Sequence, residues 1–145
     1  MIVEKLVVHH SASKKSTTKK SDIDSWHKQR GFSQVGYHKI IEGDGKIVSG
    51  RSEKLKGAHA KGTNHNSLGV CVVGNFENEI PSDVQIISVI KVLVEWCKKY
   101  ELTSTDIYGH GNISGTTTKT SCPGKNLISL LPGIKRSVLE KLEKP

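Results

Sequence analysis

The sequence has few aromatic residues, few cysteines and no long apolar run. Aromatic side chains make up only 5% of the chain, too few to stack on bases between its positive charges, so we do not expect nucleic acid as a partner. Three cysteines, an odd count in a mid-sized chain, argue against a disulfide framework. The longest apolar stretch, residues 89–96, is interrupted by Lys91 and Glu95 and is far shorter than the ~20 residues of a membrane span.

The first residues also lack the features of a secretory signal. Glu4 and Lys5 interrupt the apolar residues at the N-terminus, and residues 6–8 are too short for the apolar core of a signal peptide. We therefore expect the chain to remain in the cytoplasm of the producing cell until it is released.

The composition that is present is that of one globular domain. The chain has 145 residues, of which 34% are apolar and 25% charged. This length can bury a core without disulfides, so we expect one domain over residues 1–145. The net charge is +8, and the excess lies at the two ends, where residues 1–30 carry seven basic and three acidic side chains. An anionic partner, such as a wall polymer bound through the lysines of residues 14–20, fits this charge, although a lysine-rich soluble surface explains it equally well.

The pattern of apolar residues predicts strands that alternate with helices. A continuous apolar run bounded by glycines, residues 68–73, is typical of a central strand covered on both faces. Ser82 and Gln85 resemble a capping box at the start of a helix over residues 83–100. Further strands are expected at residues 2–8, 37–41, 46–49 and 107–109, and further helices at residues 21–30 and 132–142. This order predicts an α/β fold around one mixed sheet.

Candidate metal ligands follow the ends of two predicted strands. His9 and His10 come directly after the first strand, and His110 follows residues 107–109. Ligand sites of open α/β sheets lie at such strand ends. Twelve residues after His110 comes Cys122, in a polar, turn-rich stretch. Two imidazoles and one thiolate form a catalytic zinc set, with the fourth tetrahedral position left for water.

The alternation of side chains along a strand allows only one of the histidine pair to join this set. If the strand continues through His9 and His10, their side chains point to opposite faces. Spacing alone leaves open the ordinary interpretation, in which His9 and His110 are loop histidines and Cys122 is an inert thiol.

A series of short motifs in a particular order carries more information than any of them alone. The motifs are Val8-His9-His10-Ser11-Ala12-Ser13, Trp26-His27-Lys28, Val35-Gly36-Tyr37-His38, Asp44-Gly45-Lys46, Gly50-Arg51, Gly57-Ala58-His59-Ala60, Asn64-His65-Asn66-Ser67-Leu68-Gly69-Val70, Gly109-His110 and Ser121-Cys122-Pro123. From residue 3 to about residue 130, this series resembles the zinc N-acetylmuramoyl-L-alanine amidases, the family of the amidase-type phage lysozymes and the peptidoglycan recognition proteins.

The resemblance implies roles for individual residues. His9 rather than His10, together with His110 and Cys122, matches the zinc ligands, and Tyr37 matches a tyrosine that lines the zinc site and assists the reaction. The phage enzymes carry a catalytic lysine two residues before the cysteine, but here Thr120 stands at that position, as in many peptidoglycan recognition amidases.

The resemblance also implies that the loop containing His59 borders the substrate groove. Substrate contacts are expected at His59 and Asn66. The loop from His110 to Cys122 is expected to be longer than in the small phage enzymes. The group that protonates the leaving amine stays open between Thr120, Lys119 and Tyr37.

The fold implied is a mixed central sheet with helices on both faces and a Zn²⁺ cleft at one sheet edge. The activity implied is hydrolysis of the amide between the lactyl group of N-acetylmuramic acid and L-alanine in bacterial peptidoglycan, by a phage-type endolysin. We expect a monomer without a separate cell-wall-binding domain. Two alternatives remain: a non-catalytic peptidoglycan-binding module, and a regulatory protein that binds a macromolecule such as RNA polymerase.

Overall fold

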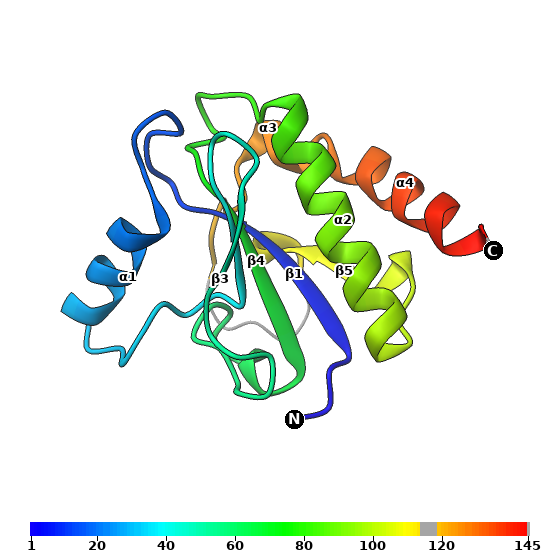
Figure 1. Cartoon of the computed structure of the whole chain (residues 1–145), viewed down its shortest axis with the longest axis horizontal. Helices are drawn as coiled ribbons and strands as arrows, with labels where there is room; N and C mark the ends of the chain where they lie inside the picture. The colour runs from blue at the N-terminus through cyan, green and yellow to red at the C-terminus, as the bar shows by residue number, and fades with distance from the viewer. Residues whose placement is uncertain (114–118, 145) are drawn as a thin grey trace.

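The computed structural model describes residues 1–113 and 119–144, and its strands form one five-stranded sheet (Figure 1). In chain order the strands are β1 (Lys5–His10), β2 (Lys39–Ile41), β3 (Ile47–Ser49), β4 (Ser67–Val72) and β5 (Ile107–Gly109). The spatial order is β3-β2-β4-β1-β5, with β2 antiparallel to β3 and the other three pairs parallel. The mixed α/β sheet predicted from the sequence is confirmed.

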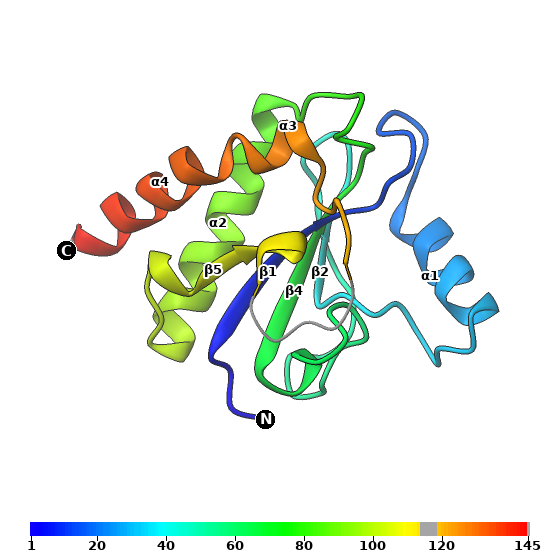
Figure 2. The ribbon, with the colours of Figure 1, turned by 180° about the vertical axis from the view of Figure 1, so that it is seen from behind.

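Helices cover both faces of this sheet, as predicted. They are α1 (Lys20–Gln29), α2 (Asp83–Tyr100), α3 (Lys125–Ile128) and α4 (Leu131–Glu143), with short 3₁₀ turns η1 (Asn64–Asn66), η2 (Ser104–Asp106) and η3 (His110–Asn112). Buried side chains of α2 and α4 form the larger core with one face of β1 and β4, whereas Ile23 of α1 packs on Ile40 and Cys71 of the other face. Figures 1 and 2 show α2 beside α4 and well apart from α1.

Strand β1 lies further along the chain than the predicted residues 2–8, since it begins at Lys5 and ends at His10. It runs through His9 and His10, because β4 continues alongside it and pairs His9 with Cys71 and His10 with Val72. Leu6 and Val8 of β1 belong to the larger core under α2. By the alternation of a strand, Val7 and His9 therefore face the opposite side of the sheet from Leu6, Val8 and His10.

Helix α2 begins with the capping box predicted for it. The Ser82 hydroxyl accepts a hydrogen bond from the Gln85 backbone N–H at 3.3 Å, and the Gln85 side-chain oxygen accepts from the Ser82 N–H at 3.1 Å. The helical spacing of the apolar residues predicts a buried stripe that includes Ile87, but Ile87 is 66% exposed, while Val89 and Trp96 are buried. Contact with α4 as well as the sheet turns the buried arc of α2 away from Ile87. Among the described helices, none is long and apolar enough to cross a membrane.

Helix α1 differs from its prediction in two details. It starts one residue early, at Lys20, and its first turn is closed by the Asp22 carboxylate, which accepts from the Lys19 backbone N–H at 2.9 Å, rather than by Ser21. The helical spacing of Trp26 from Ile23 predicts that Trp26 packs, but it is 42% exposed, and the buried residues of α1 are Ile23 and His27. The helix is short and meets the sheet along a narrow strip, so one turn of its side chains suffices for packing.

Candidate metal centre

The alternation of β1 separates the two neighbouring histidines. The His9 side chain is buried in the face opposite α2. The ring of His10 lies on the other face, where its Nδ1 accepts a hydrogen bond from the Phe76 backbone N–H at 3.1 Å. His10 is thus a structural acceptor, and its neighbour is the one that meets His110 and Cys122.

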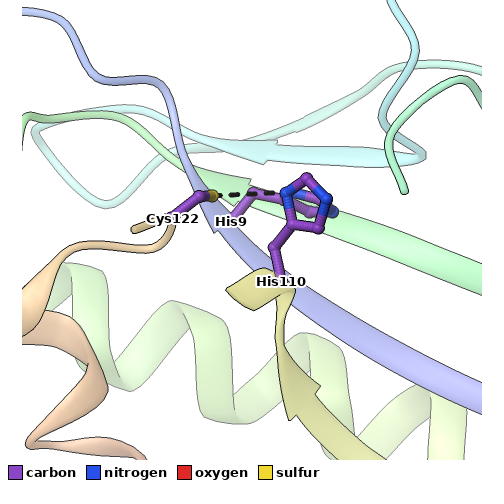
Figure 3. A group of neighbouring side chains, drawn as sticks. All are labelled: His9, His110 and Cys122. Atoms are coloured by element: carbon purple, nitrogen blue, oxygen red, sulfur yellow. Dashed lines mark hydrogen bonds between the residues drawn. The ribbon is translucent and has the colours of Figure 1, made fainter. Parts of the chain in front are cut away.

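Three side chains from distant parts of the chain converge at the carboxyl ends of β1 and β5. The ligand atoms of His9, His110 and Cys122 all lie within 4.8 Å of one another, and Figure 3 shows the three side chains turned toward a common point. The Nδ1 of His9 is 3.7 Å from the Cys122 Sγ. Ligands at 2.0–2.3 Å from a tetrahedral zinc stand about 3.6 Å apart, so this spacing suits a metal ion.

The hydrogen bonding of His110 is also consistent with a metal-binding role. Its Nε2 is buried and has no hydrogen-bond partner among the described residues. A buried polar nitrogen without a partner costs about 1–3 kcal/mol, unless a bound group satisfies it. The residues present therefore fit a cation with nitrogen and sulfur ligands, the set that zinc prefers.

Burial sets the protonation of the three side chains. It lowers the pKa of His9 well below the ordinary value, aided by the neighbouring His59 and His110, and it lowers the pKa of His110 as well. Both imidazoles are therefore neutral at pH 7, as metal ligands must be. Burial also raises the pKa of the Cys122 thiol to about 12, although a hydrogen bond from the His10 backbone N–H acts to lower it. A bound cation would displace this thiol proton.

A cleft of about 610 Å³ opens over the three side chains. Besides them, it is lined by residues of the loop after β1, of α1 and its following turn, of the loop before β4, and of the segment before Cys122. These include Ser11, Ala12, His27, Arg30, Phe32, Tyr37, Ala58, His59, Lys61, Asn64, Thr120 and Ser121. This volume lies within the range of small-molecule binding sites, about 300–1,000 Å³.

Tyr37 lies beside the metal ligands. Its ring centroid is 5.0 Å from that of His9, and it precedes β2 rather than beginning it. Burial raises the pKa of the Tyr37 phenol well above its ordinary value, and the nearby Cys71 and Cys122 sulfurs raise it further. The phenol consequently keeps its proton at neutral pH and can act as a hydrogen-bond donor, but not as a base.

Thr120 lines the cleft, and Lys119 does not. The Thr120 Oγ1 accepts a hydrogen bond from the Cys122 backbone N–H at 3.1 Å, which leaves its own proton available to a ligand. Lys119 is exposed and lies outside the cleft lining. The loop from His110 to Cys122, predicted to be longer than in the small phage enzymes, includes residues 114–118, which lie outside the described residues.

The two predicted substrate-contact residues lie in different surroundings. His59 lines the cleft, yet its Nδ1 is 2.9 Å from the His9 Nε2 and its Nε2 is 3.3 Å from the Ser67 Oγ. Asn66 is not among the lining residues, although its Oδ1 is buried without a hydrogen-bond partner in the described part of the chain. Substrate contact by these residues remains a prediction, and the geometry supports it better at His59.

Sequence reasoning missed several residues of the cleft. His27 accepts a hydrogen bond from the Gly36 N–H at 2.9 Å, and Arg30 lies 5.2 Å from the centroid of the Phe32 ring. His27 lies in the last turn of α1 and Arg30 follows directly after it, and the sequence pattern there did not indicate a contact with the cleft. His38, expected to be structural, accepts from the Gly69 N–H at 3.1 Å and lies 2.8 Å from the Leu55 carbonyl.

Comparison with known proteins places this site in a family. Residues 1–125 match the family model described as N-acetylmuramoyl-L-alanine amidase. The endolysin of Enterobacteria phage T3 is 43% identical over 104 residues, covering 68% of this chain and 69% of the relative. Peptidoglycan-recognition protein SC2 of Drosophila simulans is 30% identical over 129 residues, covering 83% of this chain and 68% of the relative.

A solved structure agrees with the sequence matches. N-acetylmuramoyl-L-alanine amidase LysC from Clostridium intestinale superimposes with a TM-score of 0.81 at 33% identity, covering 92% of this chain and 85% of that one. Sequence, fold and the convergence of His9, His110 and Cys122 therefore lead to the same conclusion: the chain belongs to the N-acetylmuramoyl-L-alanine amidases, enzymes that hydrolyse peptidoglycan.

Proposed function

We propose that this amidase cleaves the bond between the lactyl group of N-acetylmuramic acid and L-alanine, using a zinc ion held by His9, His110 and Cys122. The observation that carries the proposal is the buried, partnerless Nε2 of His110 beside two other ligand side chains. When bound, zinc supplies a Lewis acid that lowers the pKa of water towards 7 and polarises a carbonyl.

The residues around the ligands supply hydrogen bonds to the reacting amide. The phenol of Tyr37 retains its proton and can donate to the carbonyl oxygen as negative charge develops there. The Thr120 hydroxyl, anchored by the Cys122 N–H, can donate a second hydrogen bond.

Metal content and product chemistry test this proposal together. The purified chain should contain one zinc per molecule and should release new L-alanine amino groups from purified cell wall, with loss of this activity after chelation. A product with new reducing sugar ends in place of amino groups would contradict the proposed bond. An active protein that contains no transition metal would contradict the proposed metal centre.

We expect the Tyr37→Phe variant to lower turnover by about 10–10²-fold without loss of zinc. The change removes one hydrogen-bond donor near the carbonyl, and a single such donor can contribute up to about 10²–10³-fold. Turnover on soluble muropeptide, with metal content measured on the same sample, checks this. Normal turnover in the variant would remove Tyr37 from the reaction.

The Thr120→Val variant should lose at most about 10²-fold in turnover, since valine keeps the shape and removes only a neutral donor. Lys119→Met is the matched comparison, because Lys119 is exposed outside the cleft. It should keep normal turnover on soluble muropeptide. A fully active Thr120→Val together with an inactive Lys119→Met would assign the role to Lys119.

We also propose that the lysines of residues 14–20 hold the enzyme on anionic wall polymers. Lys14 and Lys19 are exposed, whereas Lys15 donates to the Ile80 carbonyl at 2.9 Å and so is directed along the surface. Replacing Lys14, Lys15, Lys19 and Lys20 by glutamine should weaken wall binding as high salt does, because exposed charges are screened beyond ~10 Å at 0.1 M. Cleavage of a small soluble muropeptide should barely change. If the variant binds the wall as tightly as the wild type, these charges serve solubility rather than wall binding.

A further inference from the structure

We infer that His59 and Ser67 position His9 for metal binding, through a chain of hydrogen bonds that ends on the Thr63 backbone carbonyl. The chain orients the His9 ring and leaves its Nδ1 as the unprotonated ligand atom. The inference builds on the metal centre proposed above, but the hydrogen bonds belong to the protein itself and can be measured without metal.

The donor and acceptor of each hydrogen bond can be assigned by starting from the last acceptor of the chain, the Thr63 carbonyl oxygen. The Ser67 Oγ lies 2.6 Å from the Thr63 carbonyl oxygen, which can only accept, so Ser67 donates its one proton there. Toward the His59 Nε2, at 3.3 Å, the same hydroxyl oxygen can then only accept. The proton of neutral His59 is therefore on Nε2, and its Nδ1 is an acceptor.

The His9 ring completes the chain. Its Nε2 lies 2.9 Å from the His59 Nδ1, which accepts, so the His9 Nε2 carries the proton. In a neutral imidazole the other nitrogen, Nδ1, then has a free lone pair. This is the atom that lies 3.7 Å from the Cys122 Sγ, on the side where the three ligand side chains meet.

The fold holds the His59 ring in place from several directions. The Asn64 Oδ1 accepts from the backbone N–H groups of His59 and Ala60 at 2.9 and 2.8 Å, which shapes the loop before β4. Below the ring lies Gly69 of β4, where an added Cβ would stand 2.7 Å from both Cγ and Nδ1 of His59. The absence of a side chain at Gly69 lets the imidazole approach the sheet closely enough to reach His9.

A hydrogen bond to the second ring nitrogen is how metal-binding histidines are held, and loss of such a partner typically weakens metal affinity 10–100-fold. His59 occupies this place for His9. The close edge-to-face packing of the two rings, with centroids 5.0 Å apart, leaves the ring of His9 little room to turn once both partners are present. His59 is on this argument a positioning residue.

The test combines zinc affinity with nitrogen NMR of the metal-free protein. His59→Phe keeps a ring and removes both nitrogens, and it should weaken zinc binding 10–100-fold in competition with a chelator. His65→Phe, a change at an exposed histidine of the same turn, should leave the affinity within about twofold. In the metal-free wild type, the His9 Nε2 proton should exchange slowly with water, and His59 should be protonated on Nε2.

Each outcome decides for or against the chain of hydrogen bonds. Wild-type affinity in a folded His59→Phe variant, or a proton on the Nδ1 of His59, would overturn it. Should His59→Phe fail to fold, Ser67→Ala replaces it, with the expected result of faster exchange of the His9 Nε2 proton and weaker zinc binding. A wild-type protein that binds no zinc but shows the expected protonation would reject the metal centre while retaining the hydrogen-bond chain.

Discussion

The His9→Ala and Cys122→Ser variants are each expected to lose most of the bound zinc and to lower amidase turnover by about 10³-fold or more. In the proposed metal centre each variant removes one of three protein ligands, and the bound ion would supply both the activation of water and the stabilisation of charge. Elemental analysis and release of L-alanine amino groups measure the two effects. Both variants should still fold, because the hydrophobic core under α2 involves neither side chain.

The matched control is His10→Asn. The neighbouring ring lies on the opposite face, and its Nδ1 only accepts the Phe76 N–H. Asparagine can replace that acceptor with its side-chain oxygen. This variant should therefore keep its zinc and its turnover. If His10→Asn lost the metal and His9→Ala kept it, the assignment within the pair would be reversed.

The metal-free protein is expected to lose at least about 2 kcal/mol of unfolding free energy between pH 7 and pH 5. Burial lowers the pKa of six histidines, and that of His59 falls to about 3; the six are His9, His10, His27, His38, His59 and His110. Because the folded-state pKa is lowered, the unfolded chain binds more protons, and stability falls as the pH drops below about 6.5. His59 alone contributes about 2 kcal/mol over this range, and the lowered pKa values of the other five histidines add to that loss.

Urea unfolding with a chelator present, at pH 7, 6 and 5, measures this dependence. Since domains of this kind are stable by about 5–15 kcal/mol, the midpoint should fall visibly. The His59→Phe variant should show a shallower dependence on pH, whatever its stability at pH 7. Equal midpoints at pH 7 and pH 5 would mean that the buried histidines titrate as they do in water.

Local patterns were sufficient to predict much of the fold. The capping box at Ser82 and Gln85 set the start of α2 within a residue, because a cap depends on atoms only three residues apart. The alternation rule correctly placed His9 and His10 on opposite faces, given only that the strand continued. The buried face of α2 was harder to predict from the sequence, because the position of α4 decides whether Ile87 is covered.

The site was only partly predictable for the same reason. The strand ends and the turn-rich stretch after them indicated the histidine pair, His110 and Cys122, and the resemblance to a family selected His9 over His10. The contact between His59 and His9 joins residues 50 apart and depends on a loop folding over a glycine in a neighbouring strand. No periodicity in the sequence encodes such an approach. Arg30 and Phe32 likewise reach the cleft only because α1 ends beside it.

The convergence of distant ligands gives the metal a second consequence. His9 and Cys122 are 113 residues apart in sequence, so their meeting requires nearly the whole chain to be folded. An ion that binds only the folded state stabilises it by about 4 kcal/mol when its free concentration is 1,000 times the dissociation constant. If the proposed zinc is the ion bound, the lifetime of the enzyme against proteases would follow the zinc supply of the cell that makes it. Metal starvation would reduce the amount of enzyme as well as its activity.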